Sequence, residues 1–118
     1  MKSPLATLVL IGTLLTAATA VADDNAMTAG DLQQLCLGSD TTSKNVCRIY
    51  ILGVVQGIEV GLNMRGRRPC VPATISAESL QQTIKSKLDE DLTAVPSDKN
   101  LVAAGIIGGI VARSFPCH

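Results

Sequence analysis

The chain has 118 residues, with ten basic and ten acidic side chains and only two aromatic ones, Tyr50 and Phe115. A balanced charge provides no broad basic surface for nucleic acid, and two rings are too few to form platforms for stacked bases. This length suffices for one small domain. The composition therefore argues against a nucleic-acid-binding protein.

The first 22 residues predict a cleaved export signal. Lys2 gives a positive start, and residues 5–15 form an apolar stretch of about 11 residues, too short to span a bilayer. Ala20-Val21-Ala22 fits the rule for signal-peptidase cleavage, so the mature chain is expected to begin at Asp23. Cleavage after Ala20 and a buried N-terminal helix are the alternatives. We expect residues 23–118 to form a single domain, exported to the periplasm without a membrane anchor.

Four cysteines remain in the exported part of the chain: Cys36, Cys47, Cys70 and Cys117. An even number of cysteines behind an export signal indicates disulfides in an oxidising compartment. A zinc site is the competing interpretation. It is disfavoured because the sequence has no C-x-x-C pair and its single histidine, His118, is the last residue. We therefore expect no metal and no other cofactor.

Two helices are predicted in the first half of the domain. Thr28 and Asp31 have the spacing of a capping box, which predicts a helix over about residues 29–37. A second helix is predicted over about residues 43–64, with its polar residues confined to a narrow stripe. It should therefore be covered by neighbours on most sides. Its glycines at positions 53, 57 and 61 suggest a tight crossing by another helix of the chain, or a small-ligand cleft.

Two further helices are predicted in the second half. Ser76 is a plausible N-cap for a third helix that ends in the acidic residues 89–91, and Leu80, Ile84, Leu88 and Leu92 share one face of it. Residues 96–98 should break the chain and cap a fourth helix over about residues 99–114. Strands over residues 49–55 and 106–111 are the alternative, but neither segment alternates with period two. The fold class is all-α, a compact bundle of about four helices.

The cysteine spacing restricts how the disulfides pair. Cys47 and Cys70 lie near opposite ends of the second predicted helix, about 25 Å of helix axis apart, so they should not pair. Two connectivities remain, and we favour Cys36–Cys47 with Cys70–Cys117 over Cys36–Cys70 with Cys47–Cys117. The favoured bonds join the first two helices across a local turn and tie the loop after the second helix to the C-terminus. In the chain-entropy model they contribute roughly 3 and 4 kcal/mol.

No residue pattern predicts catalysis. A nucleophile needs a base within hydrogen-bond reach, but the cysteines are expected in disulfides and His118 is the C-terminal residue. Adjacent carboxylates at residues 89–91 point in different directions on a helix, which argues against an acid–base pair. The glycines lie inside predicted helices, so no phosphate-binding loop is expected. The sequence therefore favours a protein that binds another protein and is not an enzyme.

The order and spacing of several residues resemble the Rap/Tai family of periplasmic immunity proteins, which neutralise peptidoglycan amidase toxins delivered by type VI secretion. The matching residues are Leu35-Cys36, Cys47, Tyr50-Ile51, Gly53-Val54, Gly57, Cys70-Val71-Pro72 and Phe115-Pro116-Cys117. The resemblance implies a compact helical domain, often a homodimer, that inserts a surface loop into the catalytic groove of the toxin.

Function should then lie in surface segments outside the shared pattern. One candidate is the basic segment with Arg65, Arg67 and Arg68, although cations also suit the end of a helix. The favoured candidate is the segment with Asp89, Glu90, Asp91 and Asp98, because its acids oppose the dipole at a helix C-terminus.

Two alternatives belong to other functional classes. One is a small periplasmic chaperone or stress protein that exposes its apolar fourth helix on acidification. The other is a carrier with a ligand cleft between glycine-lined helices, for which the sequence offers no polar anchor.

Overall fold

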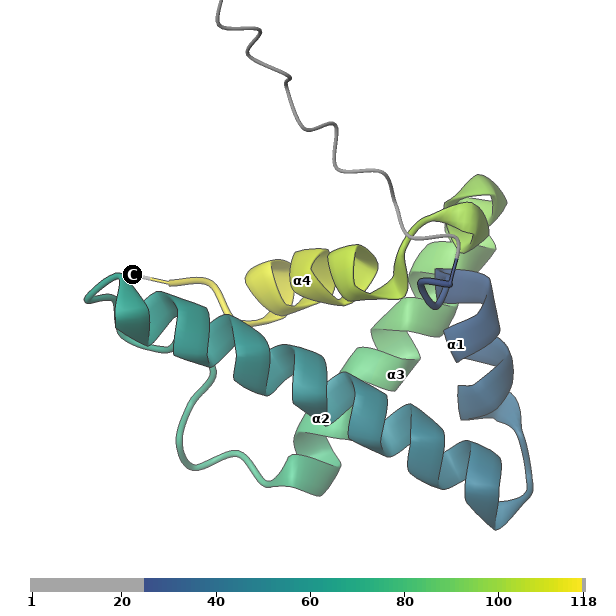
Figure 1. The fold of residues 1–118 in the computed structure, drawn as a ribbon, viewed down its shortest axis with the longest axis horizontal. Coiled ribbons are helices and arrows are strands. Elements are labelled where there is room, and N and C mark those ends of the chain that lie inside the picture. The colour runs from purple at the N-terminus through teal and green to yellow at the C-terminus, as the bar shows by residue number, and fades with distance from the viewer. Residues whose placement is uncertain (1–24, 118) are drawn as a thin grey trace, which may run out of the picture.

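The computed structural model describes residues 25–117, which form four α-helices and one short 3-10 helix (Figure 1). The elements are α1 (Ala29–Leu37), α2 (Thr41–Met64), α3 (Ala77–Ala94), η1 (Pro96–Asn100) and α4 (Ala103–Ser114). The predicted all-α bundle is confirmed. The predicted export signal lies outside the described residues, as does His118.

Side-chain caps explain where the first three helices begin. The hydroxyl of Thr28 accepts a hydrogen bond from the backbone N–H of Asp31 at 3.1 Å, and the predicted capping box is present. Ser76 caps α3 as predicted. In α2 the carboxylate of Asp40 accepts from the backbone N–H of Ser43 at 2.8 Å, so the helix begins at Thr41, two residues earlier than predicted.

The core lies where α1, α2, α3 and α4 meet. On α3, the predicted face of Leu80, Ile84, Leu88 and Leu92 is buried. The other large, fully buried side chains come from α1, α2 and α4, namely Leu32, Cys47, Ile51, Val55, Ile107 and Ile110. Because α4 contributes its apolar residues to this core, exposing them would require the bundle to open.

The connection between α3 and α4 differs from the prediction. Helix α3 continues to Ala94, and residues 96–100 form η1 instead of capping a helix that starts at Lys99. Helix α4 begins only at Ala103 and has no side-chain cap. The backbone explains the difference, because the N–H of Ala29 donates to the carbonyl of Leu101 at 2.8 Å and the N–H of Ala103 donates to that of Met27 at 2.9 Å. This pairing keeps residues 101–102 extended.

The prediction that neighbours cover α2 on most sides is wrong. Of its 24 residues only Cys47, Ile51 and Val55 are buried, although its length and hydropathy would suit a membrane-spanning helix. The side chains of Ile49, Val60 and Met64 are 71%, 57% and 85% exposed. At 100° per residue these three lie on the side of the helix opposite the core.

The glycines of α2 lie open as well. A Cβ atom added at Gly53, Gly57 or Gly61 would meet no atom within 4 Å beyond its own helix and chain neighbours. No helix within residues 25–117 therefore crosses α2 closely at these positions, and the predicted tight intramolecular crossing is wrong. None of the three lines any of the cavities described for residues 25–117, so these cavities give no support to the alternative of a ligand cleft over this stripe.

The favoured cysteine pairing is confirmed. Cys36–Cys47, the N-terminal disulfide, joins α1 to the first half of α2, and its two cysteines are buried. Cys70–Cys117, the C-terminal disulfide, joins the loop after α2 to the segment after α4, and Cys117 is exposed. The Cα atoms of each pair are 5.0 Å apart. The two bonds thus anchor opposite ends of α2, as the positions of α1 and of the C-terminus in Figure 1 show.

Candidate protein-binding surfaces

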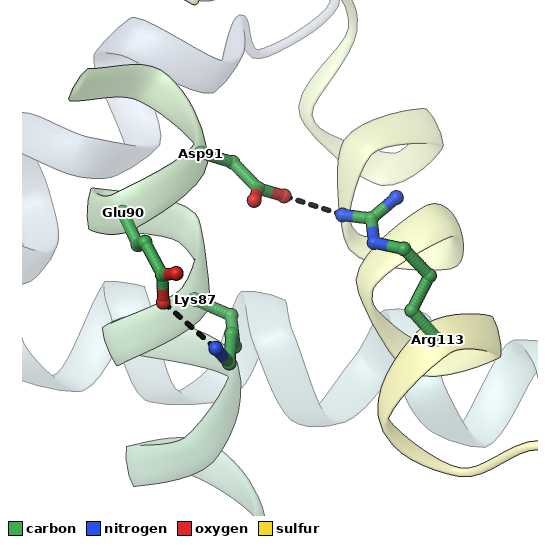
Figure 2. Close-up of polar contacts among 4 residues, drawn as sticks. All are labelled: Lys87, Glu90, Asp91 and Arg113. Carbon is green, nitrogen blue, oxygen red and sulfur yellow. Dashed lines mark hydrogen bonds and ion pairs between the residues drawn. The ribbon is translucent and has the colours of Figure 1, made fainter. Parts of the chain in front are cut away.

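Each carboxylate of the acidic cluster (Asp89, Glu90, Asp91) has a partner within the chain. Asp89 accepts a hydrogen bond from the amide of Gln33 on α1 at 2.7 Å. Figure 2 shows the other two pairs, Glu90 with Lys87 and Asp91 with Arg113 of α4. The Glu90 hydrogen bond also raises the pKa of Lys87. These contacts give the three acids an intramolecular role, although the acids lie at a helix end where the dipole disfavours them.

Only two of the four predicted acidic residues share a cavity. Asp91 and Asp98 both line a hollow of about 400 Å³ between the end of α3, η1 and α4, with Ile106 and Arg113 among the other lining residues. Asp89 lines a separate, smaller cavity beside α1, and Glu90 lines neither. Within residues 25–117, the Asp98 carboxylate accepts no side-chain hydrogen bond and forms no ion pair. Among the described residues, Asp98 is thus the one of the four acids whose carboxylate has no side-chain partner.

The connector (residues 95–102, between α3 and α4) also exposes apolar side chains that the sequence analysis did not single out. Val95, Leu101 and Val102 are 47%, 50% and 40% exposed. The connector is nevertheless held firmly, because Val102 pairs with Thr28 in an antiparallel bridge flanked by the backbone hydrogen bonds described above. A rigid backbone that presents apolar side chains around a carboxylate has the composition of a protein-binding site.

The basic turn (residues 65–69) is a second candidate. Gly66 adopts a φ of 70°, and the N–H groups of Gly66 and Arg67 donate to the carbonyls of Asn63 and Leu62, at 3.0 and 2.9 Å. This pattern is a Schellman motif, in which a left-handed glycine closes the end of a helix. Arg65, Arg67 and Arg68 are exposed, and their guanidinium groups form no ion pair with any described residue.

The fold does not bring the two predicted segments together. The basic turn lies at the C-terminal end of α2, beside the end of the chain, whereas the connector lies next to the start of α1 (Figure 1). One compact binding site therefore cannot contain both.

Residues 25–117 contain no group of three or more His, Cys, Asp or Glu side chains that could hold a metal ion. What the described surface offers is exposed apolar and charged side chains on segments fixed by backbone hydrogen bonds and disulfides. A small bundle of this kind has the features of a rigid helical scaffold that can bind another protein.

Comparison with known families agrees with this class. The model of the family described as Rap1a immunity proteins matches residues 28–117, which include all four helices and both disulfides. The chain belongs to the Rap1a immunity protein family. No curated protein and no solved structure matches it. The family membership confirms the resemblance stated from the sequence.

Proposed function

We propose that this protein is an exported, non-enzymatic immunity protein that binds and inhibits a peptidoglycan amidase delivered by type VI secretion. Membership of the immunity family supports a toxin as the partner. A mechanism by binding fits the chemistry of the described residues, since the four cysteines are in disulfides and the acidic cluster is in hydrogen bonds and ion pairs. On this proposal the protein acts by occupying a surface of the toxin.

The connector is the segment that we propose enters the catalytic groove of the amidase. The observation that carries this assignment is the exposure of Val95, Leu101 and Val102 on a backbone clamped to the start of α1. Apolar side chains that become buried on binding supply most of the affinity at a contact, and a pre-ordered segment loses little conformational entropy. Asp98 would add one carboxylate that needs no internal bond to be broken.

Inhibition of a peptidoglycan amidase toxin, the proposed partner, tests this assignment. The variants Val95→Asp and Asp98→Lys should each weaken inhibition of peptidoglycan hydrolysis, by about tenfold or more for Val95→Asp if this side chain is a hot spot. Lys44→Glu, an exposed change at the start of α2, is the matched control and should inhibit like the wild type. Equal inhibition by Val95→Asp, Asp98→Lys and the wild type would remove the connector from the interface.

The basic turn is tested in the same assay. Arg67→Glu reverses one unpaired charge without breaking an internal ion pair. Because the turn lies at the other end of the molecule, we expect this variant to leave inhibition through the connector unchanged. A loss of inhibition comparable with that of Val95→Asp would assign the contact to the basic turn instead.

We also propose that residues 1–22 are removed on export and that the protein works in the periplasm. The support is the sequence pattern at Lys2, residues 5–15 and Ala20-Val21-Ala22 together with the two disulfides, which need an oxidising compartment to persist. N-terminal sequencing of the protein from an envelope fraction should begin at Asp23. A protein that retains Met1, or that stays with the cytoplasmic fraction, would contradict the proposal.

A homodimer through the outer face of α2 completes the proposal. This face carries exposed apolar side chains and three open glycines, and it lies opposite the core. In an antiparallel crossing centred between Gly53 and Gly57, Ile49 of one copy would face Gly61 of the other, so that a large side chain meets a site without one. Such a contact is two-fold symmetric and self-complementary, as an isologous dimer requires.

Sedimentation measures this association directly. Ile49→Asp places a charge within the proposed contact, opposite Gly61 of the other copy, and should give a monomer at concentrations where the wild type is a dimer. Lys44→Glu should sediment like the wild type. A wild-type protein that stays monomeric, or an Ile49→Asp variant that still dimerises, would contradict this arrangement.

A further inference from the structure

A mainly apolar cavity of about 300 Å³ lies between the second half of α2, the start of the loop after α2, and α4. Its apolar walls are formed chiefly by Ile58, Leu62, Val71, Val111 and Phe115. Both cysteines of the C-terminal disulfide, Gly108 and Ala112 complete the lining together with Glu59, its one ionisable residue. This cavity is separate from the hollow beside the connector, so the proposed toxin contact does not use it.

The basic turn adjoins one end of the cavity in the chain, although none of its arginines is among the residues that line the cavity. Leu62 and Cys70 both line it, and the basic turn is the segment that joins them. The turn is fixed by the N–H of Arg67 bonded to the carbonyl of Leu62, and its three guanidinium groups have no intramolecular ion pair among the described residues. Glu59 lines this cavity and also the neighbouring one formed with residues 71–77.

We propose that this cavity binds a single-chain anionic amphiphile, with the hydrocarbon chain inside and a carboxylate or phosphate head at the basic turn. The walls suit an alkyl chain because burial of apolar surface needs no directed partner. The arginines supply charge-assisted hydrogen bonds for the head, and repulsion by Glu59 keeps the head away from its side of the cavity. A volume of about 300 Å³ accommodates one chain of moderate length and not a two-chain membrane lipid.

The C-terminal disulfide holds this site together. Phe115 and Cys117 belong to the segment after α4, and the bond to Cys70 keeps that segment over the cavity. Opening the bond would free one wall while the core residues of α4 stay in place. Binding should therefore weaken when the C-terminal disulfide is reduced and the buried N-terminal disulfide is still intact.

Calorimetric titration of the exported protein with three ten-carbon ligands tests the proposal, each below its micelle-forming concentration. Decanoate should bind about tenfold more tightly than decanol, from the added charge-assisted bonds, and decyltrimethylammonium should bind more weakly than either. Equal affinity for the three head groups, or no binding of decanoate, overturns the proposal. Binding to phosphatidylglycerol vesicles is measured in parallel, to distinguish a site for a free amphiphile from a site for a membrane surface. Vesicle binding without decanoate binding also overturns it.

Two glycines of α4 give a matched pair of variants that locate the site. A Cβ atom at Gly108 meets the Cδ1 atom of Ile58 at 4.0 Å, an ordinary contact, so Gly108→Leu keeps the helix and fills the cavity. Gly105→Leu makes the same change at a position where a Cβ atom meets nothing within 4 Å. Gly105 lines a different cavity, the hollow beside the connector. Decanoate binding should be lost in the first variant and kept in the second. Binding kept in Gly108→Leu overturns the proposal.

A variant outside the cavity decides the matter if Gly108→Leu fails to fold, as judged by circular dichroism. Replacing the three arginines of the basic turn by glutamine should weaken decanoate binding about tenfold and leave decanol binding unchanged. Unchanged decanoate binding in that variant would refute the cationic head-group site. Amidase inhibition by Gly108→Leu and by the arginine variant shows whether the toxin contact is separate, and we expect it to be unaffected in both.

Discussion

Replacing Ile51 or Ile49 by alanine removes the same atoms from the same helix, two residues apart, but the structure predicts opposite results. Ile51 is 0% exposed in the core, and truncating such a side chain costs about 2–5 kcal/mol through lost burial and the cavity that remains. Ile49 is exposed, so its truncation loses little burial. Alanine also has the higher helix propensity, by a few tenths of a kcal/mol.

The loss in the free energy of unfolding is measured by urea unfolding, followed by circular dichroism, with both disulfides intact. With a slope of about 1.5 kcal/mol/M for a small domain, a loss of about 3 kcal/mol lowers the midpoint for Ile51→Ala by about 2 M. The midpoint for Ile49→Ala should stay the same or rise slightly. The measurement requires a protein concentration at which sedimentation shows a monomer, because a dimer contact at Ile49 would otherwise add to the result.

Equal losses for the two variants at that concentration would refute the orientation of α2. A loss for Ile49→Ala that appears only as the protein concentration rises would instead support the outer face of α2 as a dimer contact.

Three further predictions concern the ends of the helices and the disulfides. Limiting reductant should open the exposed C-terminal disulfide before the buried N-terminal one, as read by alkylation and mass spectrometry; the reverse order would contradict the difference in burial. Gly66→Ala should lower stability by about 1 kcal/mol because alanine disfavours a φ of 70°, and an unchanged thermal midpoint would contradict the turn geometry. A hydrogen bond from the backbone N–H of Ser43 lowers the pKa of Asp40 below its ordinary 3.8. The ionised Asp40 therefore stabilises the folded protein above pH 3.8, and this stabilisation is lost as the pH falls through the lowered pKa of the folded state. Between about pH 6 and about pH 2.5, the free energy of unfolding should therefore fall less for Asp40→Asn than for the wild type. Identical losses would contradict the role of Asp40 as a charged helix cap.

Local chemistry accounts for what the sequence predicted well. The bounds of α1 follow from Thr28 and Asp31, which are three residues apart and need no distant partner. The buried face of α3 follows from leucine and isoleucine at intervals of four. Short-range geometry also narrowed the disulfide pairing to two connectivities, since the length of α2 excludes Cys47 with Cys70, and the favoured one includes a bond across a local turn.

Contacts between distant parts of the chain account for the errors. The acidic cluster is explained by Gln33 and Arg113, which lie 56 and 22 residues away from the carboxylates that they contact. The extended residues of the connector depend on pairing with residues 27–29. Composition showed that α2 is apolar, but it could not show whether the apolar face is covered by the same chain.

The candidate site was predicted only in part for the same reason. Asp98 and the segment around it were identified from an acidic cluster whose own members have internal partners. The exposed Val95, Leu101 and Val102 were not singled out, because their exposure depends on how the connector is clamped. Leu101 and Val102 fell within the fourth predicted helix, over residues 99–114, so no signal in the sequence separated them from the apolar residues of that helix.

Hydrogen–deuterium exchange of the protein with and without the amidase proposed as its partner tests the proposed mechanism most directly. If the connector enters the catalytic groove, amide exchange at residues 95–102 should slow in the complex while the basic turn exchanges as in the free protein. Protection of the basic turn or of the outer face of α2, with the connector unchanged, would contradict it.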